Sequence, residues 1–437
     1  MKSKEKVYKT MISRPVELGL RSIGVWPDSM FPRLYQYLWA IGMIMALIFQ
    51  FSYIIVRIEV DDLLDLLDCF STSLSYVVVF SKMIFFWLNR SKLLLSGLDR
   101  VSFKKPPLAF WIKTWGQTLS PSISGILFDR VIMSRIFYWI LRAIEEDWKE
   151  NVGTDWSRRI IYEKTKLSEI CSNWIMGIDV SAAFFYGVAI IMAEAINYPT
   201  TVDSVNFTKT FVLKMEFPFD SQTSPIYELV VVAQLTHEVA MVAVGATVNA
   251  VVVTLVLHIS GQIDIIRERL LSMNNSSEST LAIIKSLVNK HHKIIIFSEN
   301  IERLFSYIAL VQFLMLTLLI CCIGLRLVIS LDTQQDYLAV TLLKLFGYYF
   351  CKNMEAFIIC YAGEYLSEKS KSIGDAAYNC LWYNMSKNEC SLLLPLILRS
   401  QKQLRITIGK FMDLSLRRFA AILKASASYM SVLYALY

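Results

Sequence analysis

The sequence predicts an all-α membrane protein, and its overall apolarity and its long apolar runs are the two observations that predict it. Of the 437 residues, 55% are hydrophobic and only 19% are charged, and the mean hydropathy is +0.46. A soluble protein of this length would carry more charge. Seven separate stretches each have roughly the 20 residues that an α-helix needs to cross about 30 Å of hydrocarbon.

Each predicted span is bounded by polar or charged residues. The predicted spans are residues 34–56, 63–88, 170–193, 226–257, 304–325, 337–361 and a terminal one within 411–437. The first and fifth contain no charged residue. Charges interrupt the second, third and sixth spans, at Asp65, Asp68, Lys82, Asp179, Lys344, Lys352 and Glu355. Because a charge in hydrocarbon is costly, such residues are expected to face water or a partner; Asp179 and Glu194 either line a water-filled vestibule or pair locally.

The distribution of Lys and Arg predicts how the spans are oriented. The leader at 1–33 and the segments 89–169, 258–303 and 362–410 hold 34 of these residues, and the alternate segments hold four. Basic residues collect on the cytoplasmic side, so the N-terminus is predicted to be cytoplasmic and the C-terminus extracellular. This topology is opposite to that of a G-protein-coupled receptor. It places Asn206, in an Asn-Phe-Thr glycosylation sequon, outside the cell.

The last sixty residues carry a series of motifs in a fixed order. They are Tyr378, Trp382 and Tyr383, then Leu392–Leu394, Arg399–Gln401, Thr407–Lys410, Leu414, Phe419 and Ser428-Tyr429. This series resembles the C-terminus of insect odorant receptors. Two further signatures support the resemblance: Glu146-Asp147-Trp148, and His258 with Gly261-Gln262.

This resemblance implies the function of an odour-tuning subunit in a ligand-gated, non-selective cation channel. It implies assembly with the shared co-receptor into a heterotetramer in the dendrite membrane of an olfactory neuron, anchored by a cytoplasmic helical region at 362–410. The terminal helix would line the pore, with a gate at Val432 and Leu436 beside Ala435. Ligands would be small volatile or hydrocarbon odorants, bound in the outer halves of the second, third, fourth and sixth spans. Those halves contain Phe70, Leu74, Phe184, Tyr186, His237, Phe346 and Tyr349.

One segment departs from the family pattern. Between Asn89 and Glu146 the chain has about forty extra residues, roughly 101–141, and Val101-Ser102 can be encoded by the intron start GTAAGT. Within it, 123–141 is apolar but carries Asp129, Arg130 and Arg135, at about 2.5–3.5 kcal/mol each near a bilayer centre. We therefore assign it to the cytoplasm and hypothesise a retained intron. Transcript reads that all contain the segment would refute that origin.

The sequence shows no arrangement of residues typical of an enzyme. The four histidines have no metal-ligand spacing, there is no phosphate-binding glycine loop, and the basic loops are explained by membrane orientation without nucleic acid. No cofactor is expected. The nearest alternative is a gustatory receptor of the same fold, whose usual C-terminal Gln-Phe is missing after Tyr429. A G-protein-coupled receptor is less compatible because of the charge distribution.

Overall fold

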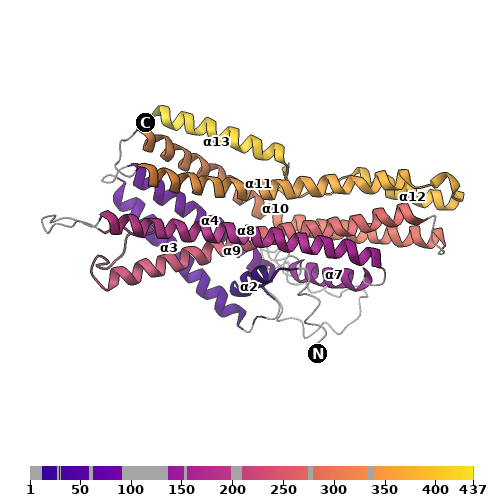
Figure 1. Cartoon of the computed structure of the whole chain (residues 1–437), viewed down its shortest axis with the longest axis horizontal. Coiled ribbons are helices and arrows are strands. Elements are labelled where there is room, and N and C mark those ends of the chain that lie inside the picture. The colour runs from indigo at the N-terminus through magenta and orange to yellow at the C-terminus, as the bar shows by residue number, and fades with distance from the viewer. Residues whose placement is uncertain are drawn as a thin grey trace, which may run out of the picture.

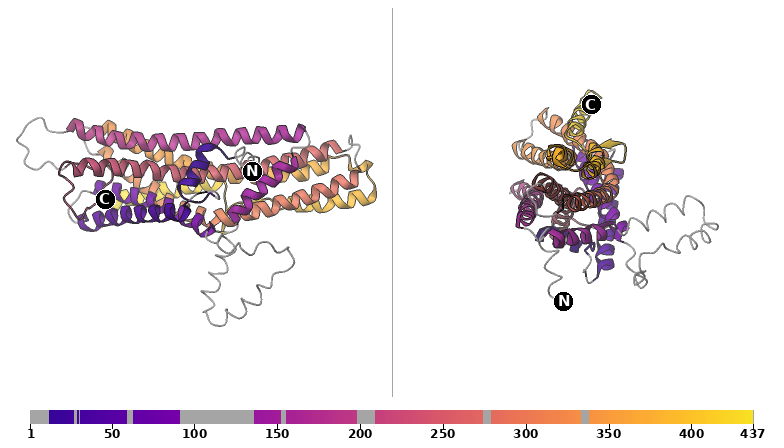
Figure 2. Two further views of the ribbon diagram at one scale, coloured as in Figure 1. Left: turned by 90° about the horizontal axis from the view of Figure 1, so that it is seen from below. Right: turned by 90° about the vertical axis from the view of Figure 1, so that its right-hand side faces the viewer.

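Most of the described helices lie side by side along one long axis, as Figures 1 and 2 show. The computed structural model describes residues 12–26, 29, 31–58, 63–90, 136–151, 155–197, 209–273, 279–332 and 338–436. Apart from one two-stranded hairpin, the regular structure within these ranges is helical. The predicted all-α fold is confirmed.

Seven long helices follow the predicted spans. They are α3 (Pro32–Arg57), α4 (Leu63–Arg90), α8 (Asp155–Asn197), α9 (Ile226–Ser272), α10 (Thr280–Asp332), α11 (Leu338–Asn379) and α13 (Leu416–Leu436). The first five are long and apolar enough to cross a membrane. The helices α11 and α13 lie where the sixth and seventh spans are predicted, but they are not among these five, so the count of seven spans stays a prediction. The shorter helices are α2 (Arg14–Ser22), α7 (Ile136–Asn151), η3 (Trp382–Asn384) and α12 (Lys387–Gln401).

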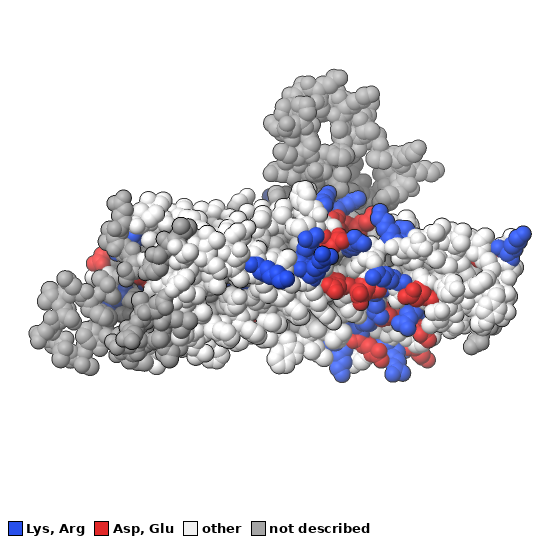
Figure 3. Space-filling view, turned by 90° about the horizontal axis from the view of Figure 1, so that it is seen from above, with Lys and Arg blue, Asp and Glu red and all other residues white. Residues whose placement is uncertain are grey.

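Four of the helices are longer than a bilayer requires. Helices α8, α9, α10 and α11 have 43, 47, 53 and 42 residues, and at 1.5 Å per residue each extends for about 60–80 Å. At one end of the bundle, α10 and α11 pack with α12. Lys, Arg, Asp and Glu gather over that half in Figure 3, whereas the other half of the visible face is nearly free of charge except at its tip.

The uncharged half exposes large apolar side chains. On α3, Ile41, Ile55 and Val56 are among the apolar residues that are more than half exposed. Exposed apolar surface on this scale needs a covering of lipid or of another protein. Together with the five apolar helices, this surface identifies the chain as a multi-pass membrane protein.

The centre of the bundle is α9, which packs against α4, α8, α10 and α11. From Val244 to Ile266 nearly all its side chains are buried. Helix α2 crosses it: a Cβ atom added at Gly19 would lie 2.1 Å from the Thr247 hydroxyl oxygen. The leader is therefore partly structured and packs on the core, which the polar sequence of 1–33 did not indicate.

Two of the signatures noted in the sequence meet in the structure. The imidazole Nε2 of His258, on α9, lies 2.9 Å from a carboxylate oxygen of Asp147, on α7. His258 is buried, and its ring also packs 5.1 Å from that of Phe297 on α10. The contact fixes α7 against the two central helices.

Helix α7 also includes the end of the segment at 101–141. Residues 91–135 lie outside the described part of the chain. The side chains of Ile136, Phe137, Ile140 and Leu141 are buried in the core. The last six residues of that segment therefore contribute to the packing of the bundle.

Helix α12 begins with a capping box. The Ser386 hydroxyl accepts from the Glu389 backbone N–H, and the Glu389 carboxylate accepts from the Ser386 N–H at 2.8 Å. The hydrogen bonds from Ser386 lower the pKa of Glu389, because they favour the ionised carboxylate. The sequence thus sets the start of α12 locally.

A short hairpin connects α12 to α13. Strand β1 (Thr407–Ile408) pairs antiparallel with β2 (Met412–Asp413), and Gly409 and Lys410 turn the chain with φ of +59° and +66°. The Gly409 N–H donates to the Ser306 carbonyl of α10 at 2.9 Å, and the Thr407 hydroxyl donates to Glu302 at 2.7 Å. The hairpin is thereby fixed to α10.

We predict that Gly409→Ala lowers the stability of the protein. The left-handed φ costs an L-residue about 1–2 kcal/mol, and the added Cβ would lie 2.8 Å from the Leu310 Cδ2 atom. Gly177→Ala is the matched control: it lies within α8 with nothing within 4 Å of its added Cβ, so it should be neutral or stabilising. The melting temperature of each detergent-purified variant, monitored by size-exclusion chromatography, measures both effects. Equal melting temperatures would contradict the prediction.

Candidate ligand-binding cavity

A cavity of about 590 Å³ lies among α4, α8, α9 and α11. Most of its wall is apolar or aromatic, formed by Val78, Val79, Ala182, Ala183, Phe185, Tyr186, Val188, Ala189, Met241, Val242, Gly245, Ala246, Leu343, Gly347, Tyr348 and Phe350. Its polar side chains are Thr72, Ser75, Asp179, Glu238, Cys351, Lys352 and Glu355. A cavity of this size with few polar groups is typical of a site for a small organic molecule.

Helical periodicity explains which residues reach the cavity. Helix α9 contributes Glu238, Met241, Val242, Gly245 and Ala246, which lie three or four positions apart and so share one face. The lining residues of α8 follow the same spacing. The space itself results from small side chains, since glycine and alanine stand at positions on α8, α9 and α11 where larger residues would fill it.

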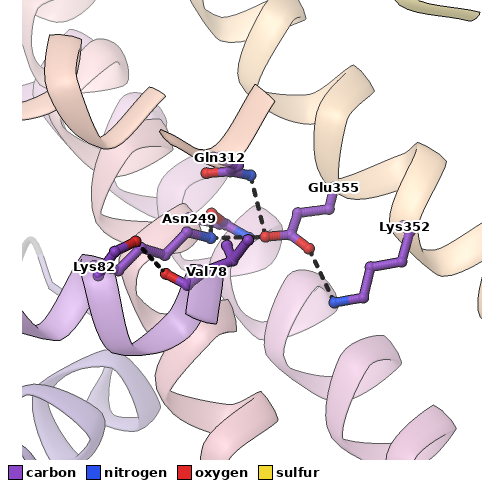
Figure 4. Close-up of polar contacts among 7 residues, drawn as sticks. Val78, Lys82, Asn249, Gln312, Lys352 and Glu355 are labelled. Carbon is purple, nitrogen blue, oxygen red and sulfur yellow. Dashed lines mark hydrogen bonds and ion pairs between the residues drawn. The ribbon is translucent and has the colours of Figure 1, made fainter. Parts of the chain in front are cut away.

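One end of the cavity is formed by a buried ion cluster centred on the Glu355 carboxylate. Its Oε1 atom accepts from the Lys82 ammonium at 2.7 Å, from Asn249 Nδ2 at 3.0 Å and from Gln312 Nε2 at 3.1 Å. Its Oε2 atom accepts from the Lys352 ammonium at 3.4 Å. Figure 4 shows these side chains converging from α4, α9, α10 and α11.

The cluster provides the pairing and hydrogen bonds that the buried ammonium group of Lys82 needs. The Lys82 side chain is only 1% exposed, and a buried ammonium is tolerated only where it is paired and hydrogen-bonded. Lys82 also donates to Asn249 Oδ1 at 3.0 Å. The amide of Asn249 therefore bridges the cation and the carboxylate, and one carboxylate serves two lysines.

Hydroxyl groups line the wall between α4 and α11. The Ser75 hydroxyl lies 2.6 Å from the Tyr348 hydroxyl, and the Tyr348 ring lies 6.1 Å from that of Tyr186 on α8. The Lys352 ammonium lies 5.8 Å from the centre of the Tyr348 ring. Aromatic faces thus adjoin the ion cluster.

The seven residues predicted for the ligand site fall into three groups. Tyr186 lines the cavity. Leu74 and Tyr349 pack with the core, and His237 bonds through Nδ1 to the Tyr76 hydroxyl at 3.0 Å. Phe70, Phe184 and Phe346 are exposed on the outer surface of the bundle. The structure thus brings one of the seven to the lining of this cavity.

The remaining site predictions lie elsewhere. Val432 and Ala435 are exposed on α13, with 57% of Val432 accessible, whereas the Leu436 side chain and Asn206 lie outside what the structure describes. The charged residues of the ion cluster were visible in the sequence as interruptions of the spans. Asn249, Gln312 and the small residues of the cavity gave no such signal.

Comparison with known proteins identifies relatives in one family. A family model described as 7tm odorant receptor matches residues 132–427. Odorant receptor 13a of Drosophila melanogaster is 27% identical over 247 residues, 52% of this chain and 58% of that protein. The match thus spans little more than half of that relative. The odorant receptor coreceptor of Aedes aegypti is 34% identical over 120 residues, covering 28% of this chain and 25% of that protein.

The fold matches that of a solved structure. The insect olfactory receptor OR5 from Machilis hrabei, in complex with eugenol, superposes with a TM-score of 0.70. The superposition covers 97% of both chains, at 15% sequence identity. The likeness extends over nearly the whole bundle.

We predict that Glu355→Gln strongly destabilises the bundle, because it removes the carboxylate that pairs with the buried Lys82 and the partly buried Lys352. Breaking a buried pair from one side costs about 3–5 kcal/mol. Replacing Lys82 by Met in the same chain should recover part of the loss. Thermal melting of purified protein measures the series.

The control for this series is Glu163→Gln, whose partner Arg159 lies at 3.0 Å on the surface of α8. Exposed pairs of this kind are worth at most about 1 kcal/mol. A Glu355→Gln protein that melts with the control would show that the ion cluster does not hold the helices together.

Proposed function

Because this chain belongs to the 7tm odorant receptor family, we propose that it is an odour-binding receptor subunit whose ligand occupies the cavity among α4, α8, α9 and α11. The cavity is the observation that carries the proposal. Its volume of about 590 Å³ and its apolar and aromatic wall suit a small volatile molecule. The solved relative from Machilis hrabei, which shares the fold, was captured with eugenol, a molecule of this size class.

We propose that ligand binding opens a non-selective cation path lined by α13. Binding favours one of two arrangements of the helices, and a ligand shifts their populations by its difference in affinity for them. Support comes from the surface of α13, where Val432 and Ala435 are exposed in the single chain. A face with apolar side chains that lacks a partner within one subunit can meet its counterparts around a central axis.

The proposed partner is the shared co-receptor, in a heterotetramer. The similarity to the Aedes aegypti coreceptor supports a common assembly surface. The packing of α10 and α11 with α12 supports an anchor region that would hold the subunits together. We propose seven spans with a cytoplasmic N-terminus and an extracellular C-terminus, in the dendrite membrane of olfactory neurons.

The test is expression with and without the insect co-receptor, recording odour-evoked whole-cell current while G-protein signalling is blocked. A current that needs the co-receptor and survives the block is expected. A response that needs G protein and no co-receptor would contradict the proposal.

We predict that Ala182→Phe reduces odour sensitivity by about tenfold or more, equivalent to about 1.4 kcal/mol of binding. The phenyl ring would occupy space in the cavity that Ala182 lines. Ile178→Phe, on the exposed surface of the same helix, is the control and should leave the dose–response curve unchanged. Equal curves for the two variants would place the ligand elsewhere.

We predict that Val432→Ser raises the resting current of the co-receptor complex. A ring of apolar side chains excludes ions by dewetting, and a hydroxyl group admits water. Val56→Ser on α3 is the control, because Val56 is 58% exposed and Val432 is 57% exposed. An unchanged resting current and an unchanged ion selectivity in Val432→Ser would exclude this residue from the gate.

A further inference from the structure

The cavity wall holds more negative than positive charge. The charged groups at or beside it are the carboxyl groups of Asp179, Glu238 and Glu355 and the ammonium groups of Lys82 and Lys352. Three acids thus stand against two bases. One carboxylate is in excess when all five groups are ionised.

Both ammonium groups are held by the same carboxylate. Lys82 and Lys352 each bond to Glu355, at 2.7 and 3.4 Å. Asp179 lies close enough to this cluster to interact electrostatically with Glu355, Lys352 and Lys82. Asp179 interacts with both ammonium groups, whereas Glu238 interacts with that of Lys352 alone. Glu238 is therefore the acid of the wall with the fewest cationic neighbours.

Glu238 lacks a hydrogen bond on the oxygen that needs one. Its Oε2 atom is buried and has no hydrogen-bond partner among the described residues. The Tyr76 hydroxyl lies 3.0 Å from His237 Nδ1 and also interacts with the Glu238 carboxyl group, but it does not satisfy Oε2. A buried carboxylate that is short of hydrogen bonds is costly, so a donor that a ligand brings to Glu238 from the cavity it lines would gain a strong interaction.

The surroundings of Glu238 suit a cation with an apolar body. Met241 and Val242 continue the same face of α9, and the rings of Phe185, Tyr186 and Tyr348 line the same cavity. Aromatic faces attract ammonium groups, and a carboxylate supplies the opposite charge. Alcohols and hydrocarbons would use the apolar wall but leave the excess charge unmatched.

We propose that this receptor is tuned to small volatile amines, whose ammonium group pairs with the Glu238 carboxylate while the hydrocarbon part occupies the apolar cavity. The inference rests on the proposed odour-binding function, and it narrows the ligand class. It makes Glu238 a specificity-determining residue.

Three compounds of nearly the same shape test the inference: 2-phenylethylamine, 2-phenylethanol and propylbenzene, which end in an ammonium, a hydroxyl and a methyl group. With the co-receptor present, the amine should evoke half-maximal current at a concentration at least tenfold below that of propylbenzene. Glu238→Gln should abolish this preference by raising the half-maximal concentration of the amine at least tenfold. Cell-surface labelling and size-exclusion chromatography of the variant complex show whether it has folded and assembled.

Two variants serve as controls. Glu228→Gln changes an exposed acid in the first turn of the same helix and should keep the amine preference. Asp179→Asn removes the other acid of the wall. If the preference depends on Asp179 and not on Glu238, the assignment of the ammonium to Glu238 is overturned.

The remaining outcomes separate the inference from the proposed function. A broad odour panel that evokes co-receptor-dependent current without an amine preference overturns the inference alone. If no compound evokes current, although the complex reaches the cell surface and a reference receptor responds, the proposed function fails. Melting of the purified complex then tests the inference separately, since a bound ligand raises the melting temperature. A rise with 2-phenylethylamine that Glu238→Gln removes would support it, and no rise would overturn it.

Discussion

The arrangement of the central helices depends on the carboxylate of Glu355, which pairs with the ammonium groups of both Lys82 and Lys352. Glu355 connects α11 to Lys82 on α4, to Asn249 on α9 and to Gln312 on α10 (Figure 4). Apolar side chains in a lipid-covered bundle can slide past one another, because lipid tails offer contacts of similar strength. A charge pair in the same place has one acceptable geometry. The cluster therefore sets the register among these four helices together with two other ion pairs, Arg326 with Asp68 and Lys369 with Asp264.

The same helix that carries this carboxylate also fixes the base of α13. Nine residues beyond Glu355, the Glu364 carboxylate accepts the Leu416 backbone N–H at 2.7 Å, and Gly363 allows Leu414 to approach closely. The hairpin at Gly409 holds the other side of this base to α10. Helix α11 is therefore a continuous element that contacts both the cavity and the start of the proposed pore helix. A movement of α11 at Lys352 would therefore displace the start of α13 directly, with no loop between the two places.

The sequence predicts much of this fold because its main constraint is simple. A bilayer demands about 20 apolar residues for each crossing, so α3, α4, α8, α9 and α10 could be recognised by length and composition. The charged segment at 258–303 is also mostly helix, in α9 up to Ser272 and in α10 from Thr280. Its charges are satisfied on the surface and in pairs such as Lys293 with Glu150. The hairpin at Thr407–Asp413 was visible only as a motif, since two-residue strands carry no periodicity.

The residues of the candidate ligand site were harder to predict, because assigning a span does not say which face of the helix points into the bundle. Phe184 and Tyr186 lie at nearly the same depth in the membrane, but this does not say which of them faces inward. Residues two positions apart on a helix point in directions about 200° apart around its axis. Tyr186 reaches the cavity and Phe184 is exposed. Charged residues identify the inward face of a helix, because a charge within a span must face away from lipid. From Asp179 on α8, the positions 182, 183 and 186 share its face, and all three line the cavity. On α11, Lys352 and Glu355 point to Tyr348 in the same way. Interruptions that weaken a predicted span are thus the best guide to which side of it lines the cavity.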